Sequence, residues 1–303
     1  MLQSCISWHL IRKSVGYPTV KRFLNLSYKV VSESSSENPD LPPVLLLHGL
    51  LGQKKLWACL GKTIATVMKH SVLTVDLRNH GVSPHHPSHK YEDLAEDVVM
   101  LMNKLKINRA VLIGHNMGGR TSMSISLMAA ERIAGLIIVD ISPVSNCKQL
   151  AEDMLIILKT MKSIHFDGLN TRKRARTAAR IKLHTHISDS ITLNAVLKNI
   201  DVRKNGTIGW ICNLDALLKN FNHIVSFFPA HLQNIQYNGP VLFIGGQRSD
   251  FIPPDDLPDI RSIFPNVVVT YITGAGHNVH AHDPRAFLEL VIQFLKKNKE
   301  LFK

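Results

Sequence analysis

Short apolar runs alternate with amphipathic stretches over the first half of the chain. The apolar runs occupy residues 43–49, 71–81, 109–115 and 134–141. Continuous apolar runs of this length are typical of strands buried on both faces, as in parallel sheets. The intervening segments carry apolar residues at helical spacing, over residues 54–69, 91–105 and 117–130. This rhythm predicts an α/β fold, with one mostly parallel sheet and helices on both of its faces.

The rhythm is interrupted once. Between about residues 144 and 235 the chain lacks buried strand runs and carries 13 Lys or Arg against 6 Asp or Glu. This change predicts a helical cap over residues 144–235. Further strands are expected at 26–31, 239–246 and 267–273, with helices near 255–264 and 284–297. The predicted core therefore comprises residues 26–143 and 236–303.

Composition narrows the class of protein. Apolar residues make up 45% of the 303 residues and charged residues 19%, which is typical of a globular protein with a substantial core. No apolar stretch reaches the roughly 18 residues needed to span a bilayer, so no transmembrane segment is expected. The four cysteines are far apart and show no metal-ligand spacing. Reduced thiols in an intracellular compartment, with no metal and no cofactor, are therefore expected.

The start of the chain is basic. The first 32 residues contain five Lys or Arg and no acid, with serines and apolar residues between them. An acid-free, basic, amphipathic start is typical of a mitochondrial transit peptide, which we place over residues 1–25. The alternative is a basic N-terminal tail without a targeting role. The first interpretation predicts a mitochondrial protein, located in the matrix.

A second basic cluster lies within the predicted cap. Its members are Arg172, Lys173, Arg174, Arg176, Arg180 and Lys182. Such a cluster could neutralise phosphates, but no aromatic platform or nucleic-acid motif accompanies it. Alanine and isoleucine residues at helical spacing favour the solvated face of a helix, with an acidic partner protein as the next alternative. No nucleic acid is expected as a partner.

The chemistry-bearing motifs follow predicted strands. They are HGLLG (48–52), GHNMGG (114–119), the acids Asp140 and Asp250, and GAGHNVHAHDP (274–284). Ligand sites of open parallel sheets lie at the carboxyl ends of the strands, where these motifs are predicted to meet. Their order along the chain is elbow, acid, histidine, as in α/β-hydrolases.

The chain resembles the α/β-hydrolase superfamily, and within it the family of alpha/beta hydrolase domain-containing protein 11. The resemblance is carried by LPPVLLLHGLLG, VLTVDLRNHGVSPH, GHNMGG, VDISPV and NLDAL, and covers nearly the whole chain after the leader. It implies a mitochondrial acylglycerol lipase or esterase with a small ester or acylglycerol as substrate. It also implies an association with the 2-oxoglutarate dehydrogenase complex.

One position departs from the family pattern. The family's elbow reads G-x-S-x-G, whereas here it reads Gly114-His115-Asn116-Met117-Gly118, so Asn116 occupies the nucleophile position. An Asn amide is resonance-stabilised and is a feeble nucleophile. Hydrolysis is therefore expected to be impaired, and the protein is a candidate pseudoenzyme.

The rest of the site follows from the same resemblance. His277 is the expected base, and the amides of Leu50 and Met117 are expected to form the oxyanion hole. Asp250 and Asp140 are equal candidates for the acid that pairs with His277, and Asp215 is a weaker one. His280 and His282 are expected at the surface. Asn278 stands where relatives often carry Trp.

Three hypotheses stay open. The first is a hydrolase-fold protein that has lost ester hydrolysis and binds a ligand or partner. The second is an active mitochondrial hydrolase in which Asn116 is a variant or a sequencing error, because Ser and Asn codons can differ by one base. The third is deamidation of Asn116 to Asp, which Met117 disfavours because deamidation is fastest before Gly.

The leader hypothesis has a direct test. A fusion of residues 1–35 to a reporter protein is expected to enter mitochondria and to be cleaved, because the segment is basic, amphipathic and free of acids. Fluorescence microscopy and gel mobility measure the two events. An uncleaved reporter that stays diffuse in the cytosol would contradict the mitochondrial address.

Overall fold

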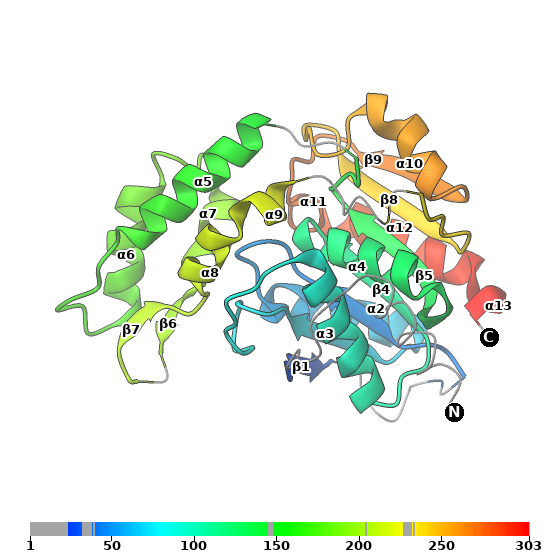
Figure 1. Cartoon of the computed structure of the whole chain (residues 1–303), viewed down its shortest axis with the longest axis horizontal. Helices are drawn as coiled ribbons and strands as arrows, with labels where there is room; N and C mark the ends of the chain where they lie inside the picture. Colours follow the sequence, from blue (N-terminus) through cyan, green and yellow to red (C-terminus); the bar gives the residue numbers. More distant parts are fainter. Residues whose placement is uncertain are drawn as a thin grey trace.

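The computed structural model describes residues 24–31, 38, 40–144, 148–203, 205–226, 232 and 234–302. Residues 1–23, and with them nearly all of the predicted leader, lie outside the described residues. Figure 1 shows a sheet sandwiched between helices, with a separate group of helices beside it. In the described part of the chain, no helix combines the length and the apolar character needed to cross a membrane.

The central sheet has seven strands in the order β1-β3-β2-β4-β5-β8-β9. β1 pairs with β3 in the antiparallel sense, and all the other neighbours are parallel. The strands are β1 (Ser27–Val30), β2 (Val44–Leu47), β3 (Val72–Asp76), β4 (Ala110–His115), β5 (Ile133–Val139), β8 (Val241–Gly246) and β9 (Val267–Ile272). The predicted α/β class, with a mostly parallel sheet, is confirmed.

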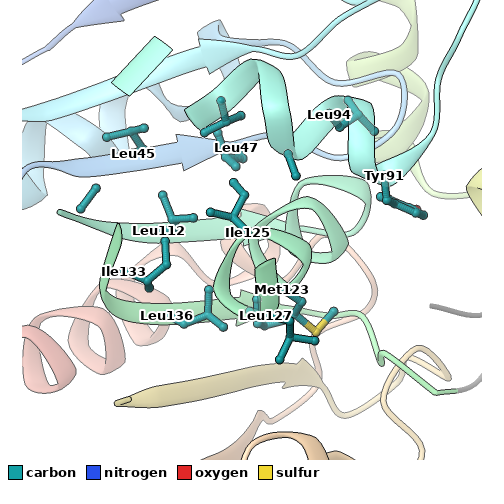
Figure 2. Close-up of a cluster of buried hydrophobic side chains, with 14 of the residues drawn as sticks. Leu45, Leu47, Tyr91, Leu94, Leu112, Met123, Ile125, Leu127, Ile133 and Leu136 are labelled. Carbon is teal, nitrogen blue, oxygen red and sulfur yellow. The ribbon is translucent and has the colours of Figure 1, made fainter. Parts of the chain in front are cut away.

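Alternate residues of each strand point to opposite faces, and both faces are covered by helices. One face packs against α3 (Tyr91–Lys104), α4 (Met117–Met128) and α10 (Leu257–Ile263). Figure 2 shows this side, where Leu45, Leu112 and Leu136 of three strands lie beside α3 and α4. The other face packs against α2 (Ala58–Met68), α12 (Pro284–Lys297) and α13 (Lys299–Phe302). Each fully buried Leu, Ile or Val side chain contributes about 1.5–3 kcal/mol relative to an exposed one, which fixes the register of the sheet.

The segment between β5 and β8 leaves the sheet and forms its own apolar cluster. Its helices are α5 (Lys148–Lys162), α6 (Arg172–Leu183), α7 (Ser190–Leu197), α8 (Leu214–Lys219) and α9 (Phe221–Val225). The sequence predicted a helical cap, but the cap also contains strands. β6 (Ile200–Val202) and β7 (Ile208–Trp210) form a two-stranded antiparallel sheet. The turn between them contains Asn205 and Gly206, and Gly206 has a positive φ of 81°. Asn-Gly between short apolar runs is a hairpin signal that the sequence already carried.

Three asparagine and glutamine side chains join the cap to loops of the core. Asn199 Nδ2 donates to the carbonyl of Leu51 at 2.6 Å, and Gln53 Nε2 donates to the carbonyl of Lys198 at 2.9 Å. Asn220 Nδ2 donates to the carbonyl of Pro87 at 2.8 Å. Buried or partly buried hydrogen bonds of this kind hold the cap at a defined place over the strand ends.

Two buried imidazoles brace the loops that leave β2 and β3. His48 Nε2 accepts the amide of Leu77 at 3.0 Å, and His80 Nε2 accepts the amide of Leu51 at 3.1 Å. Their Nδ1 atoms pair with the carbonyls of Gly49 and Arg78 at 2.8 and 2.9 Å. Each ring therefore donates at Nδ1 and accepts at Nε2, which only the neutral form can do. Burial lowers the pKa of His80 to about 3 and that of His48 below its ordinary value.

Because these histidines are buried in the neutral form, the protein is expected to lose stability as the pH falls. Because the folded pKa is lowered, the unfolded chain binds more protons below the unfolded value of 6.5, and stability falls as pH drops from 6.5 towards 3. His80 contributes a loss of about 1.4 kcal/mol per pH unit in that window, and His48 acts in the same direction. Urea unfolding at several pH values from about 7 to about 5 measures how the free energy of unfolding changes with pH.

His80→Asn is expected to flatten this slope, whereas His85→Asn is the matched control because His85 is exposed on the same loop. Equal stability at neutral pH and one or two units lower would contradict the assignment of neutral buried rings, as would an equal slope in the two variants.

Candidate active site

The elbow that joins β4 to α4 carries Asn116. β4 ends at His115 and α4 begins at Met117, so Asn116 lies alone at the junction, with φ 50° and ψ −116°. Glycines flank it because a side chain at Gly114 would collide with the backbone of Gly118, and one at Gly118 with the backbone of Leu47. A non-glycine residue held at positive φ is strained, and such strain is common at functional sites.

His277 lies in the loop after β9 and pairs with Asp140. The Nδ1 atom of His277 lies 2.7 Å from Oδ2 of Asp140. Asp140 follows β5 directly, is fully buried and accepts two further hydrogen bonds, from the Gly246 amide at 2.9 Å and from the Ser249 hydroxyl. The ring of His277 stacks on Phe251 with 3.9 Å between centroids. The carboxylate thus fixes the imidazole with Nδ1 engaged and leaves Nε2 for a ligand.

The other two candidate acids lie elsewhere. Asp250 is exposed in the bend after β8, where its neighbour Ser249 and not Asp250 turns towards Asp140. Asp215 is exposed in α8 of the cap and pairs with Lys162 at 2.6 Å. The structure therefore brings Asp140, and neither Asp250 nor Asp215, to His277.

Two backbone amides face the elbow. The Leu50 amide donates to Oδ1 of Asn116, with a long N–O distance of 3.4 Å. Met117 is the first residue of α4, so its amide has no acceptor within the helix. The side-chain oxygen of Asn116 lies beside the Leu50 amide, and the oxyanion hole expected from the two amides stays a prediction.

A cavity of 70 Å³ opens beside Asn116 and His277, between the core and the cap. The cap contributes Met154 and Ile157 of α5 and Thr192, Ala195 and Val196 of α7. The core contributes the loop after β2, Leu56, Trp57 and residues around His277. The wall is mostly apolar, with polar side chains contributed by both the core and the cap.

Two further histidines lie against this cavity. His280 is buried and stacks on Trp57 with 4.4 Å between centroids, so the expectation of a surface residue was wrong. The reason is the short helix α11 (Val279–His282), which turns His280 inwards and leaves His282 half-buried. Burial lowers the pKa of His280 to about 3 and holds the pKa of His115 well below its ordinary value. Both rings are neutral near pH 7, and His115 Nε2 hydrogen-bonds the carbonyl of His277 at 3.0 Å.

Asn278 connects the site to the cap. Its Nδ2 atom donates to Thr192 Oγ1 at 2.6 Å, and Thr192 Oγ1 donates to Asp189 at 2.5 Å. Asp189 is the N-cap of α7. Sequence reasoning missed Ser249, Phe251 and Thr192, because no local motif indicates which loop residues will meet His277 and its neighbours in space.

Known proteins share this architecture. A family model described as the alpha/beta hydrolase fold matches residues 42–163. The sn-1-specific diacylglycerol lipase ABHD11 of Xenopus tropicalis is 34% identical over 275 residues, covering 91% of this chain and 83% of that protein. Esterase YbfF of Escherichia coli (strain K12) is 28% identical over 272 residues, covering 89% of this chain and 99% of that protein.

Solved structures agree. A marine microorganism esterase superposes with a TM-score of 0.78 at 32% identity, covering 90% of this chain and all of that one. A second neighbour, an E-2-(acetamidomethylene)succinate hydrolase, has a TM-score of 0.69 at 18% identity and shares the fold. The likeness thus covers about nine tenths of the chain. By sequence and by fold, the chain belongs to the α/β-hydrolase family, among its ester and lipid hydrolases.

Proposed function

We propose that this protein binds an ester or acylglycerol in the cavity beside Asn116 and hydrolyses it poorly or not at all. The observation that supports the proposal is the assembled His277–Asp140 pair next to an elbow residue that cannot attack an acyl carbon. In a serine hydrolase, the base takes the proton of the hydroxyl, which then attacks. An Asn amide has no such proton to give and no basic lone pair on nitrogen.

The magnitude of the loss decides between impairment and a mild effect. Removing the nucleophile of a well-studied serine protease costs about 10⁶ in turnover and leaves only what binding and the oxyanion hole provide. The amides of Leu50 and Met117 can still donate to a carbonyl oxygen, beside the His277 ring that Asp140 holds in place. Binding without turnover is therefore the function that this set of groups supports best.

The cavity also suggests the size of the ligand. At 70 Å³ it is far smaller than the roughly 300–1,000 Å³ typical of pockets for drug-sized ligands. With the cap in this position, a short acyl group fits and a long one requires the cap to move. We therefore propose short-chain esters as the first ligands to test.

The cellular setting of this function rests on the sequence alone. A mitochondrial matrix location follows from the basic leader, and an association with the 2-oxoglutarate dehydrogenase complex follows from the family resemblance. Both stay predictions, because the leader lies outside the described residues and no contact in the structure concerns a partner.

Restoring the missing atom tests the proposal. The wild type is expected to turn over p-nitrophenyl esters near background and to resist fluorophosphonate labelling at the elbow. Asn116→Ser is expected to gain kcat/KM on short-chain esters by several orders of magnitude, on the order of 10³ or more, because one oxyanion donor and a placed base each contribute heavily. Kinetics and labelling of the purified proteins, with thermal melts as the check on folding, measure this.

Two double variants identify the supporting groups. Adding His277→Ala or Asp140→Ala to Asn116→Ser is expected to remove most of the gain. Adding Asp250→Ala is the matched control and is expected to leave it, because Asp250 is exposed and away from His277. A folded Asn116→Ser protein no faster than the wild type would show that more than the nucleophile is missing. Rapid hydrolysis or elbow labelling by the wild type would instead favour the alternative, an active hydrolase.

A further inference from the structure

The cap helix α6 carries the basic cluster and ends up far from the cavity. Figure 1 shows α6 at the outer edge of the cap, on the side away from the sheet. Its buried side consists of Ala175, Ala179 and Leu183. Between residues 168 and 188 the chain has six Lys or Arg and no Asp or Glu. Any acid that pairs with this cluster must therefore come from another segment of the chain.

Only part of this charge is used within the cap. Arg172 pairs with Asp201 at 3.1 Å, Arg176 donates to the carbonyl of Ile200, and Arg180 donates to Asn194. Lys173, Arg174 and Lys182 are exposed, and none of them forms an ion pair with any residue that the structure describes. Three cations therefore project into solvent from one helix.

Helix stability does not account for this arrangement. Arg172, Lys173 and Arg174 fill the first turn of α6, which contains no acid. The N-terminal end of a helix carries partial positive charge, so cations there are unfavourable and acids would be favourable. Either acidic or basic side chains would solvate an exposed helix face. Basic side chains at this helix N-terminus are unfavourable for the helix, so their presence points to an external anionic partner.

An exposed apolar side chain lies on the same face. Ile181 is 65% exposed, which is among the highest values for a large apolar residue of the described chain. It follows Arg174 by seven residues, about two turns, so these two side chains lie on one side of the helix, with Lys173 and Lys182 on the two opposite flanks of that side. Lys182 lies next to it. Cations around one exposed isoleucine, with no aromatic side chain within α6, fit a lipid bilayer better than nucleic-acid bases.

We infer that α6 docks the cap onto an anionic membrane surface, with Lys173, Arg174 and Lys182 on the headgroups and Ile181 inserted between them. Charge complementarity carries this choice, because lysine and arginine near an anionic leaflet are each attracted to it. Membrane docking goes beyond the proposed function, although it would bring a protein that binds acylglycerols to the bilayer in which they are dissolved. It does not depend on whether the site hydrolyses anything.

Vesicle binding by the full chain tests the inference without any use of activity. The wild type is expected to sediment with phosphatidylcholine–phosphatidylglycerol vesicles, to ignore pure phosphatidylcholine vesicles, and to be released by salt. Lys173→Glu with Arg174→Glu is expected to weaken the partition by more than about tenfold. Ile181→Ser is expected to weaken it less. The basic leader is the same in all proteins compared, so its contribution cancels.

A matched control removes the same charge elsewhere. Lys90→Glu with Arg261→Glu replaces one lysine and one arginine on the exposed surface of the α/β domain. This variant is expected to bind the anionic vesicles as the wild type does. The α6 variant is expected to melt no lower than the wild type, because acids suit the first turn of a helix, so its lost binding is not unfolding. Equal losses in the two double variants, or no preference for anionic vesicles, would overturn the inference. An acidic protein as the true partner would show itself in the same way, as an absence of vesicle binding.

Discussion

The hydrogen bond between His277 and Asp140 depends on the way a parallel sheet gathers distant parts of the chain at one edge. The two residues are 137 positions apart, yet each follows a strand whose carboxyl end lies at that edge. Asp140 is held by its backbone bond to Ile244 and by donors from the last residue of β8 and the loop after it, and it holds His277 in turn. The elbow at Asn116 stands between β5 and β2 and faces both the pair and the Leu50 amide. A shift of any one strand would separate these groups.

Much of this arrangement could be predicted from the sequence, because buried parallel strands have a strong local signature. The runs at 44–47, 110–115 and 133–139 lie where the apolar pattern placed them, and the glycines around Asn116 identified the elbow. The choice among Asp140, Asp250 and Asp215 could not be made in advance. The answer depends on which residue of the loop after β8 turns inwards. That residue is Ser249, whose hydroxyl donates to Asp140, and nothing in the local sequence indicates this role. The inward turn of His280 was missed for a related reason, since a four-residue helix is too short to show a period.

Asn116 changes what the assembled groups can do but leaves their placement intact. Its backbone adopts the strained conformation of the elbow, and its side chain accepts a hydrogen bond from Leu50, although at 3.4 Å this bond is weak. Burial keeps the rings of His115 and His280 neutral, and Nε2 of His115 is already engaged by the carbonyl of His277. The proposed function therefore leaves ligand binding to this site. The cap contributes apolar residues of α5 and α7 to the cavity and carries the basic helix α6 at its outer edge.

His277 and Asp140 form a base–acid pair beside Asn116, and the rest of the site is organised around this pair. Proton NMR of the wild-type protein detects it, because an imidazole N–H that donates to a buried carboxylate gives a resonance far downfield of the ordinary amide envelope. This resonance is expected in the wild type, is expected to be lost in His277→Gln and in Asp140→Asn, and is expected to persist in Asp250→Asn. Its persistence in Asp140→Asn, or its loss in Asp250→Asn, would contradict the pairing of His277 with Asp140.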